Sequence, residues 1–167
     1  MKRVGWLSLC LLGIALCARP VAAQTGTNPG FEKMKTLGGE WGGKAADGKA
    51  VEVSYRLVSS GTALMETLRP AGESEMVTIY TADGDRVAVT HYCSANNQPH
   101  MQSGPISSSP RKLDFSFVSA TNLASPAAGH MHHLTVSFQD GDHFTQDWTW
   151  KEKDKAGVET FHFTRKK

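Results

Sequence analysis

Turn-forming residue pairs recur about every 10 to 12 residues along most of this chain, and this spacing constrains the fold more than any other feature. Between the turns, apolar and polar residues alternate, which is the pattern of strands that bury one face. The alternating segments cover residues 51–55, 76–80, 87–93, 113–118, 134–138 and 144–150. The turns lie at Asp47-Gly48, Ser60-Gly61, Pro70-Ala71-Gly72, Asp83-Gly84, Ser109-Pro110, Asp140-Gly141 and Ala156-Gly157. The spacing predicts about nine or ten antiparallel strands, joined mostly by hairpins.

One short helix is predicted before the strands. Asn28 can cap it, and Pro29 suits its first turn. Its apolar face consists of Phe31, Met34 and Leu37. No second helix long enough for a parallel crossover is indicated. We therefore expect an all-β, antiparallel up-and-down barrel of about ten strands, with this helix as a plug.

Residues 1–23 have the pattern of a signal peptide. Lys2 and Arg3 precede an apolar stretch at 4–17, and small residues at 21–23 suit a cleavage site. We expect a single barrel domain at 24–167, periplasmic or secreted, without insertion into a membrane. Removing three of the 18 basic residues leaves 15 against 16 acidic ones. This near-neutral balance gives no reason to expect a nucleic-acid partner, and the basic C-terminal end is expected to be solvated.

Cys93 is the one cysteine outside the predicted signal peptide, so no disulfide can form within the mature chain. A lone cysteine in an exported protein can be a buried inert thiol, a metal ligand or an exposed thiol. Burial is favoured, because free cysteine is among the residue types most often found in protein cores.

Strand parity selects which histidines face the interior. In 86–93, His91 and Cys93 share a face with two valines. In 130–138, the apolar residues place His130 and His132 inward and His133 outward. The long segment 122–129 leads into this second group, so Asn122 is expected at the mouth of a cavity.

Three interpretations of the inward histidines remain open. Polar lining of a ligand cavity, or hydrogen-bonded core histidine, is favoured. The second is a zinc or copper site made by His91, Cys93, His130 and His132, because imidazole and thiolate ligate these metals. The third is heme, held by one inward histidine in an apolar barrel. Methionines that could line such a cavity are Met65, Met76, Met101 and Met131.

Catalytic motifs are weak in this chain. No Gly-x-Ser-x-Gly elbow occurs, and the glycine-rich segment 43–50 has Ala50 where a phosphate-binding loop needs serine or threonine. Glu66 shares a face with Leu64 and Leu68, so it is expected to be inward. It could act as a general acid or base, but an ion pair with an arginine is favoured. Whether the protein is an enzyme is left open.

Gly39, Trp41 and Gly43, placed between a short helix and a strand meander, resemble the start of calycin-type barrels such as lipocalins, fatty-acid-binding proteins and nitrobindin-like heme proteins. Segments 63–67, 90–93, 97–99, 121–123 and 142–146 more closely resemble an uncharacterised exported bacterial family with a lipocalin-like fold. That resemblance spans nearly the whole mature chain and implies a fold without an established activity. The nitrobindin pattern has a further glycine where Ala45 stands, and His162 is the nearest match to its iron-ligating histidine.

The favoured hypothesis is an exported, non-enzymatic barrel that binds a small apolar or amphipathic molecule. Its predicted ligand-binding residues are His91, Cys93, His130, His132, Glu66 and Asn122. Two alternatives are carried alongside it. One is a metal or heme protein that uses the inward His and Cys, and the other is an isomerase or hydrolase acting in the same cavity. The ligand and the oligomeric state do not follow from the sequence.

Overall fold

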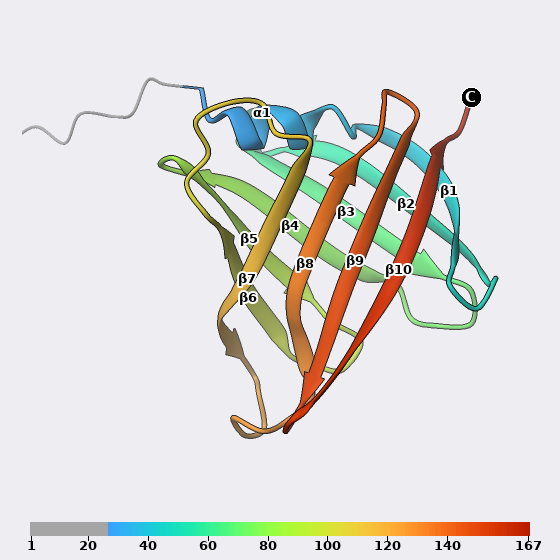
Figure 1. Ribbon diagram of the computed structural model, residues 1–167, viewed down its shortest axis with the longest axis vertical. Helices are drawn as coiled ribbons and strands as arrows, with labels where there is room; N and C mark the ends of the chain where they lie inside the picture. The colour runs from blue at the N-terminus through green and yellow to red at the C-terminus, as the bar shows by residue number, and fades with distance from the viewer. Residues whose placement is uncertain (1–26) are drawn as a thin grey trace, which may run out of the picture.

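Ten strands close into one antiparallel barrel in the computed structural model, which describes residues 27–167 (Figure 1). Strand follows strand around the wall, and β1 pairs with β10 to close it. This confirms the predicted fold. The elements are α1 (Pro29–Lys35), β1 (Gly39–Ala45), β2 (Ala50–Val58), the 3-10 turn η1 (Ser59–Gly61), β3 (Ala63–Pro70), β4 (Met76–Asp83), β5 (Arg86–Tyr92), β6 (Gln98–Ser103), β7 (Lys112–Thr121), β8 (His130–Phe138), β9 (His143–Glu152) and β10 (Lys155–Arg165). The predicted signal peptide lies outside the described residues.

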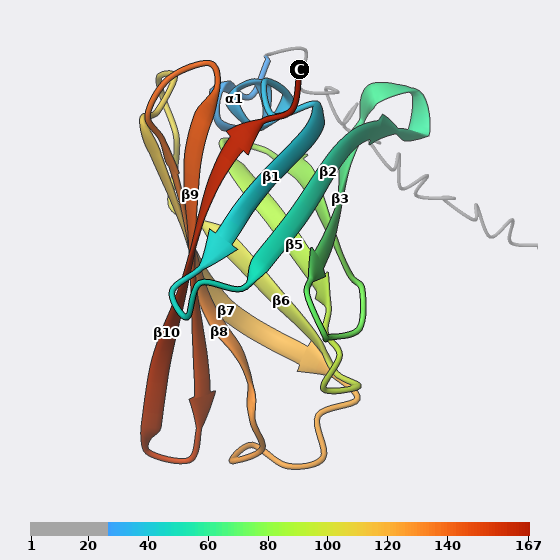
Figure 2. The ribbon, with the colours of Figure 1, turned by 90° about the vertical axis from the view of Figure 1, so that its right-hand side faces the viewer.

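The helix α1 closes one end of the barrel, as predicted (Figures 1 and 2). Asn28 caps it by accepting the Phe31 amide at 2.8 Å. The Asn28 side-chain amide also donates to the carbonyls of Gly84, at 3.0 Å, and Arg86, at 2.7 Å. One side chain therefore starts the helix and ties it to the β4–β5 hairpin. The apolar face of the helix, with Met34 fully buried, is then held against the barrel interior.

Trp41 and Arg165 lock the closed end. The Trp41 indole N–H donates to the Leu37 carbonyl at 2.7 Å, and the Arg165 guanidinium lies 4.0 Å from the centroid of the Trp41 ring. Arg165 also donates to the Thr36 and Gly38 carbonyls just after α1, at 2.9 and 2.8 Å. The prediction that the basic C-terminal end is only solvated is thus wrong for Arg165, because the closing β1–β10 pair brings it onto Trp41.

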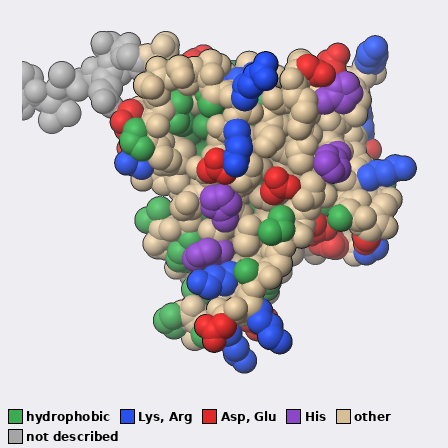
Figure 3. Space-filling model, in the orientation of Figure 1, with side chains coloured by type: hydrophobic (Ala, Val, Ile, Leu, Met, Phe, Trp, Pro, Cys, Tyr) green, Lys and Arg blue, Asp and Glu red, His purple; other side chains and the backbone are tan. Residues whose placement is uncertain are grey.

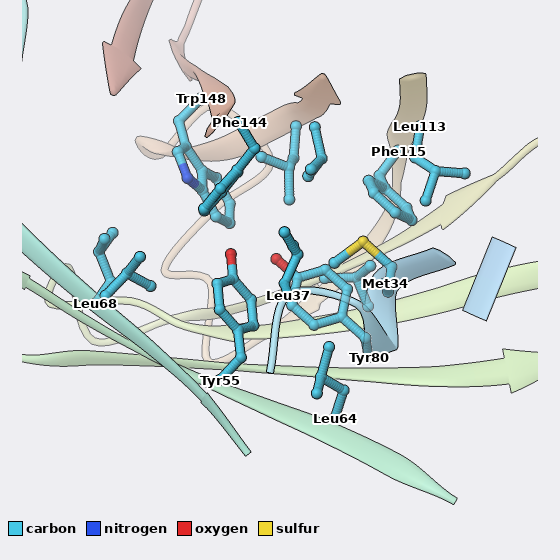
Figure 4. Packing of buried hydrophobic residues seen from close by; sticks show 14 of the residues in the cluster. Met34, Leu37, Tyr55, Leu64, Leu68, Tyr80, Leu113, Phe115, Phe144 and Trp148 are labelled. Carbon is cyan, nitrogen blue, oxygen red and sulfur yellow. The ribbon is translucent and has the colours of Figure 1, made fainter. Parts of the chain in front are cut away.

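Large side chains fill the interior near the closed end (Figure 4). Phe144 packs edge-on against Trp41, with ring centroids 4.7 Å apart, and stacks on Phe163 at 4.8 Å. Tyr80 lies tilted against Phe115 on the other side of the barrel. The interior next to α1 is therefore filled by side chains.

The opposite end has an uneven rim, because β9 and β10 extend beyond β1 (Figure 2). In the register, β1 ends with Ala45 opposite Phe161, whereas β10 continues to Lys155 alongside β9. No helix in the described part of the chain is long and apolar enough to cross a membrane.

Candidate functional site

A pocket of about 390 Å³ opens at the end of the barrel that α1 leaves uncovered. Its volume falls in the range of about 300–1,000 Å³ that small-molecule sites occupy. Most of the lining is apolar or aromatic, and the polar groups are few. The lining residues are Leu68, Pro70, Glu73, Met76, His91, Cys93, Ser94, Ala95, Met131, Trp148, Trp150, Glu159 and Phe161.

A row of polar side chains leads from the barrel wall to this pocket. Tyr55, Glu66, Thr78 and His91 are successive cross-strand partners on β2, β3, β4 and β5. Cross-strand partners lie on the same face of a sheet, so all four side chains point inward. We call these four residues the polar row. Each is at most 3% exposed.

Glu66 is the centre of the polar row. Its Oε2 accepts hydrogen bonds from the Tyr55 hydroxyl at 2.7 Å, the Tyr80 hydroxyl at 2.8 Å and the Gln146 amide at 2.7 Å. Thr78 donates to its Oε1 at 3.2 Å. Burial raises the pKa of Glu66, and these four donors oppose that rise. Figure 4 shows the Tyr55 and Tyr80 rings extending into the interior.

The prediction of an inward Glu66 is confirmed, but the favoured arginine partner is wrong. Neutral donors from the adjacent strands β2 and β4, and from β9 across the barrel, surround the carboxylate instead. Glu66 does not line the pocket, so it cannot contact a ligand there directly. Its chemical effect on the pocket is transmitted through Thr78 to His91.

His91 is the member of the polar row that reaches the pocket. Its Nδ1 lies 2.9 Å from the Thr78 hydroxyl, and its ring packs on Trp148 with centroids 4.5 Å apart. The other ring nitrogen, Nε2, is buried without a hydrogen-bond partner. Burial lowers the pKa of His91 to about 4, so the ring is neutral at pH 7.

The polar row assigns the roles of the two His91 nitrogens. The Thr78 hydroxyl donates its proton to Glu66, so its oxygen must accept the remaining hydrogen bond, from His91. The His91 Nδ1 then carries the proton, which leaves a lone pair on Nε2. His91 therefore offers the pocket a hydrogen-bond acceptor.

Two carboxylates stand at the edge of the pocket. Glu159 is the cross-strand partner of Trp148, which places it on the inner face of β10, and Glu73 lies in the β3–β4 turn. Burial raises the pKa of Glu159, and the negative charges of Glu73 and Asp47 add to the rise. The lining contains neither lysine nor arginine.

Cys93 follows β5 and lines the pocket two residues after His91. It is a free thiol and is buried, as the favoured interpretation predicts. Burial raises the pKa of its thiol, so the neutral form prevails at pH 7. Cys93 therefore contributes a weakly polar wall rather than a nucleophile.

Contrary to the prediction, His130 and His132 do not line the pocket, although His130 is buried, at 5% exposed. A register shift in β8 between Met131 and His133 inserts one extra residue, a β-bulge. Met131 then pairs with Trp150 and lines the pocket, while His130 pairs with Lys151 on the outer face. Figure 3 shows histidine side chains on the outer surface of the molecule. His133 is outward, as predicted.

The two misassigned histidines form a pair of their own. The His130 Nδ1 donates to the Ala128 carbonyl at 2.8 Å, so its Nε2 accepts from the His132 Nδ1 at 3.1 Å. Both rings pack on Phe117, with centroids 4.6 and 5.1 Å from its ring. Burial, and then the positive charge of Lys151, lower the pKa of His132. This pair belongs to the β7–β8 contact rather than to the pocket.

The predicted metal set does not come together. His91 and Cys93 line the pocket, whereas His130 and His132 bond to each other outside it. In the described part of the chain, no group of three or more His, Cys, Asp or Glu residues is arranged to hold a metal ion. His162, the nearest match to an iron ligand, is exposed and pairs with Lys44 and Thr145 on the outer face. Of the four methionines proposed for a heme cavity, Met76 and Met131 line the pocket.

Asn122 lies beside the open end, in a second groove of about 520 Å³. Its side-chain amide donates to the Asn96 carbonyl and joins two turns. The groove shares Ala95 and Trp150 with the pocket. Asn122 thus lies near the mouth, as expected, without lining the pocket itself.

Sequence reasoning missed several groups around the site. The hydroxyls of Tyr55, Thr78 and Tyr80 and the amide of Gln146 hold the buried carboxylate, although nothing in local spacing links them to Glu66. Glu159 could have been found, because it shares strand parity with the inward Phe161 and Phe163.

Comparison with solved structures supports the barrel assignment. The crystal structure of Rv2717c from M. tuberculosis matches with a TM-score of 0.59 and 12% identity, over 82% of this chain and 97% of that chain. A protein of unknown function from the DUF3598 family, from Nostoc punctiforme PCC 73102, matches with a TM-score of 0.55 and 14% identity. That match covers 80% of this chain and 49% of the other. No protein-family model matches the sequence, and no curated protein matches it significantly. At these identities the similarity establishes the fold alone.

Proposed function

We propose that the open end of the barrel binds a small apolar or amphipathic molecule. The observation that carries this proposal is His91, which lines a pocket of about 390 Å³ and whose buried Nε2 has no hydrogen-bond partner. An unpaired buried polar group costs about 1–3 kcal/mol, and a ligand donor would recover that cost. Aromatic and aliphatic walls from Trp148, Trp150 and Phe161 supply the apolar contact.

Calorimetry with a neutral probe tests this proposal. We expect 2-naphthalenemethanol to bind, because its rings match the aromatic walls and its hydroxyl can donate to His91. Met131→Trp fills the pocket and should abolish binding. Met65→Trp is the matched control, since Met65 pairs with Arg56 and Ile79 on the other face of the sheet. The proposal fails if the unsubstituted protein does not bind the probe, or if both variants bind equally.

Heme is a less suitable occupant of this pocket. His91 Nε2 could ligate iron, but heme carries two carboxylates, and the lining holds Glu73 and Glu159 without a basic residue. We expect hemin to cause no histidine-type shift of its absorbance band when it is mixed with the protein. A shift that is lost in His91→Leu would instead support the heme alternative.

We further propose that the protein is exported and that residues 1–23 are removed. The charged, apolar and small-residue segments of the N-terminal sequence support this proposal. Sequencing the N-terminus of protein recovered from outside the cytoplasm should give Gln24 as the first residue. Recovery of protein that still begins at Met1 from the cytoplasm alone would contradict it.

A further inference from the structure

The charge of the pocket is unbalanced. Glu73 and Glu159 line it, and neither carboxylate forms an ion pair or hydrogen bond with a described residue. The basic residue that influences both is Lys49, whose ammonium is paired with Asp47 at 2.8 Å. With His91 neutral at pH 7, the lining holds two carboxyl side chains and no basic side chain to balance them.

The carboxylates, the aromatic wall and the buried acceptor belong to one surface. Glu159 is the cross-strand partner of Trp148, and the centroid of the His91 ring lies 4.5 Å from that of the Trp148 ring. Trp150 continues the wall toward the rim of the barrel. A ligand that lies against these indoles therefore meets an acceptor at depth and negative charge at the edge.

We propose that the ligand is a small aromatic cation that carries N–H donors, such as an aryl-alkyl ammonium. This inference rests on the proposed function and specifies its ligand class. An ammonium can donate to a rim carboxylate or to His91 Nε2, and indole faces also attract cations. A carboxylate or sulfate group would meet the carboxyl groups of Glu73 and Glu159 and no basic side chain, so anionic amphiphiles such as fatty acids are disfavoured.

Three probes with the same ring system test the inference by calorimetry at pH 7. They are 2-naphthylmethylamine, which is cationic, 2-naphthalenemethanol, which is neutral, and 2-naphthoate, which is anionic. We expect the cation to bind about tenfold more tightly than the neutral probe, and the anion to bind most weakly. Raising the salt concentration to about 1 M should reduce the preference, because salt screens exposed charges.

The double variant Glu73→Gln, Glu159→Gln should bring the affinity for the cation to that for the neutral probe. Glu40→Gln, at the closed end of the barrel, removes a remote charge and should leave the preference unchanged. If the neutral probe binds but the cation binds no more tightly, or the double variant keeps the preference, the inference is wrong and the proposed function stands. If none of the three probes binds, the proposed function itself is wrong.

Discussion

The guanidinium of Arg165 lies 4.0 Å from the centroid of the Trp41 ring, although 124 positions separate the two residues in the sequence. The contact joins the last strand to the first and lies directly below the end of α1. The contact therefore links the β1–β10 pairing that closes the barrel wall to the helix that covers one end of the barrel. Both residues belong to the scaffold, since the pocket lies at the other end.

Replacing Arg165 should therefore destabilise the fold. We expect Arg165→Ala to lower the free energy of unfolding by about 1–3 kcal/mol, because it removes a cation–π contact and three hydrogen bonds to backbone carbonyls. Arg165→Lys should recover part of the loss. Lys166→Ala is the control and should cost less than about 1 kcal/mol, since its ion pair with Glu52 is exposed. Urea denaturation measures all three, and equal effects of the two alanine variants would contradict the prediction.

Glu66 should be required for stability more than for direct ligand contact. We expect Glu66→Leu to lower the free energy of unfolding by about 3–5 kcal/mol, because Tyr55, Tyr80, Thr78 and Gln146 would all lose an acceptor. Glu75→Leu, which breaks an exposed ion pair with Arg69, should change it by less than about 1 kcal/mol. Denaturant unfolding would contradict this prediction if the two variants were equally stable.

His91 should make the native state sensitive to mild acid. Its pKa is about 4 in the folded protein against 6.5 for the free side chain, so between these values the unfolded chain binds more protons. Stability from this residue is therefore lost as pH falls from about 6.5 to about 4, by about 3 kcal/mol in total. His91→Gln lacks this group. The difference in unfolding free energy between the unsubstituted protein and His91→Gln should therefore change between about pH 6.5 and about pH 4. A difference that stays constant over this range would contradict the prediction.

Gly129 should control the position of Trp150. A Cβ on Gly129 would lie 2.1 Å from the Trp150 Cζ2, so Gly129→Ala must displace the indole. We expect a cost of about 1–3 kcal/mol in stability and weaker binding of the neutral naphthyl probe. Gly157→Ala is the matched control. Gly157 is the cross-strand partner of Trp150, yet a Cβ there would meet nothing within 4 Å. Equal probe affinities in the two variants would contradict the expected displacement.

The sequence allowed the fold to be predicted because each signal that specifies it is local. Asn28 and Pro29 begin α1 as expected, and alternation within β2, β4, β5, β7 and β9 assigns their inner faces correctly. His91 and Glu66 were identified as inward from this parity alone. Parity is a sound guide wherever a strand runs without interruption.

The candidate site was predicted only in part, and β8 shows why. One extra residue at His132 reverses the side-chain order, so Met131 lines the pocket in place of His130 and His132. The residues 130–133 contain no glycine to signal the bulge, which is specified by pairing with β9. The partners of Glu66 come from three other strands, so their convergence depends on the closed register of the whole barrel.

Because β10 is longer than β1, the two ends of the barrel differ, and only one of them would admit a ligand. One end is sealed by α1, and at the other the β9–β10 hairpin projects beyond the end of β1 (Figure 2). A molecule bound as proposed would therefore enter and leave by the same opening, past Glu159 on the longer β9–β10 side. The side chains around this opening would then set how long a ligand stays in the pocket, while its affinity would also depend on the contacts deeper inside.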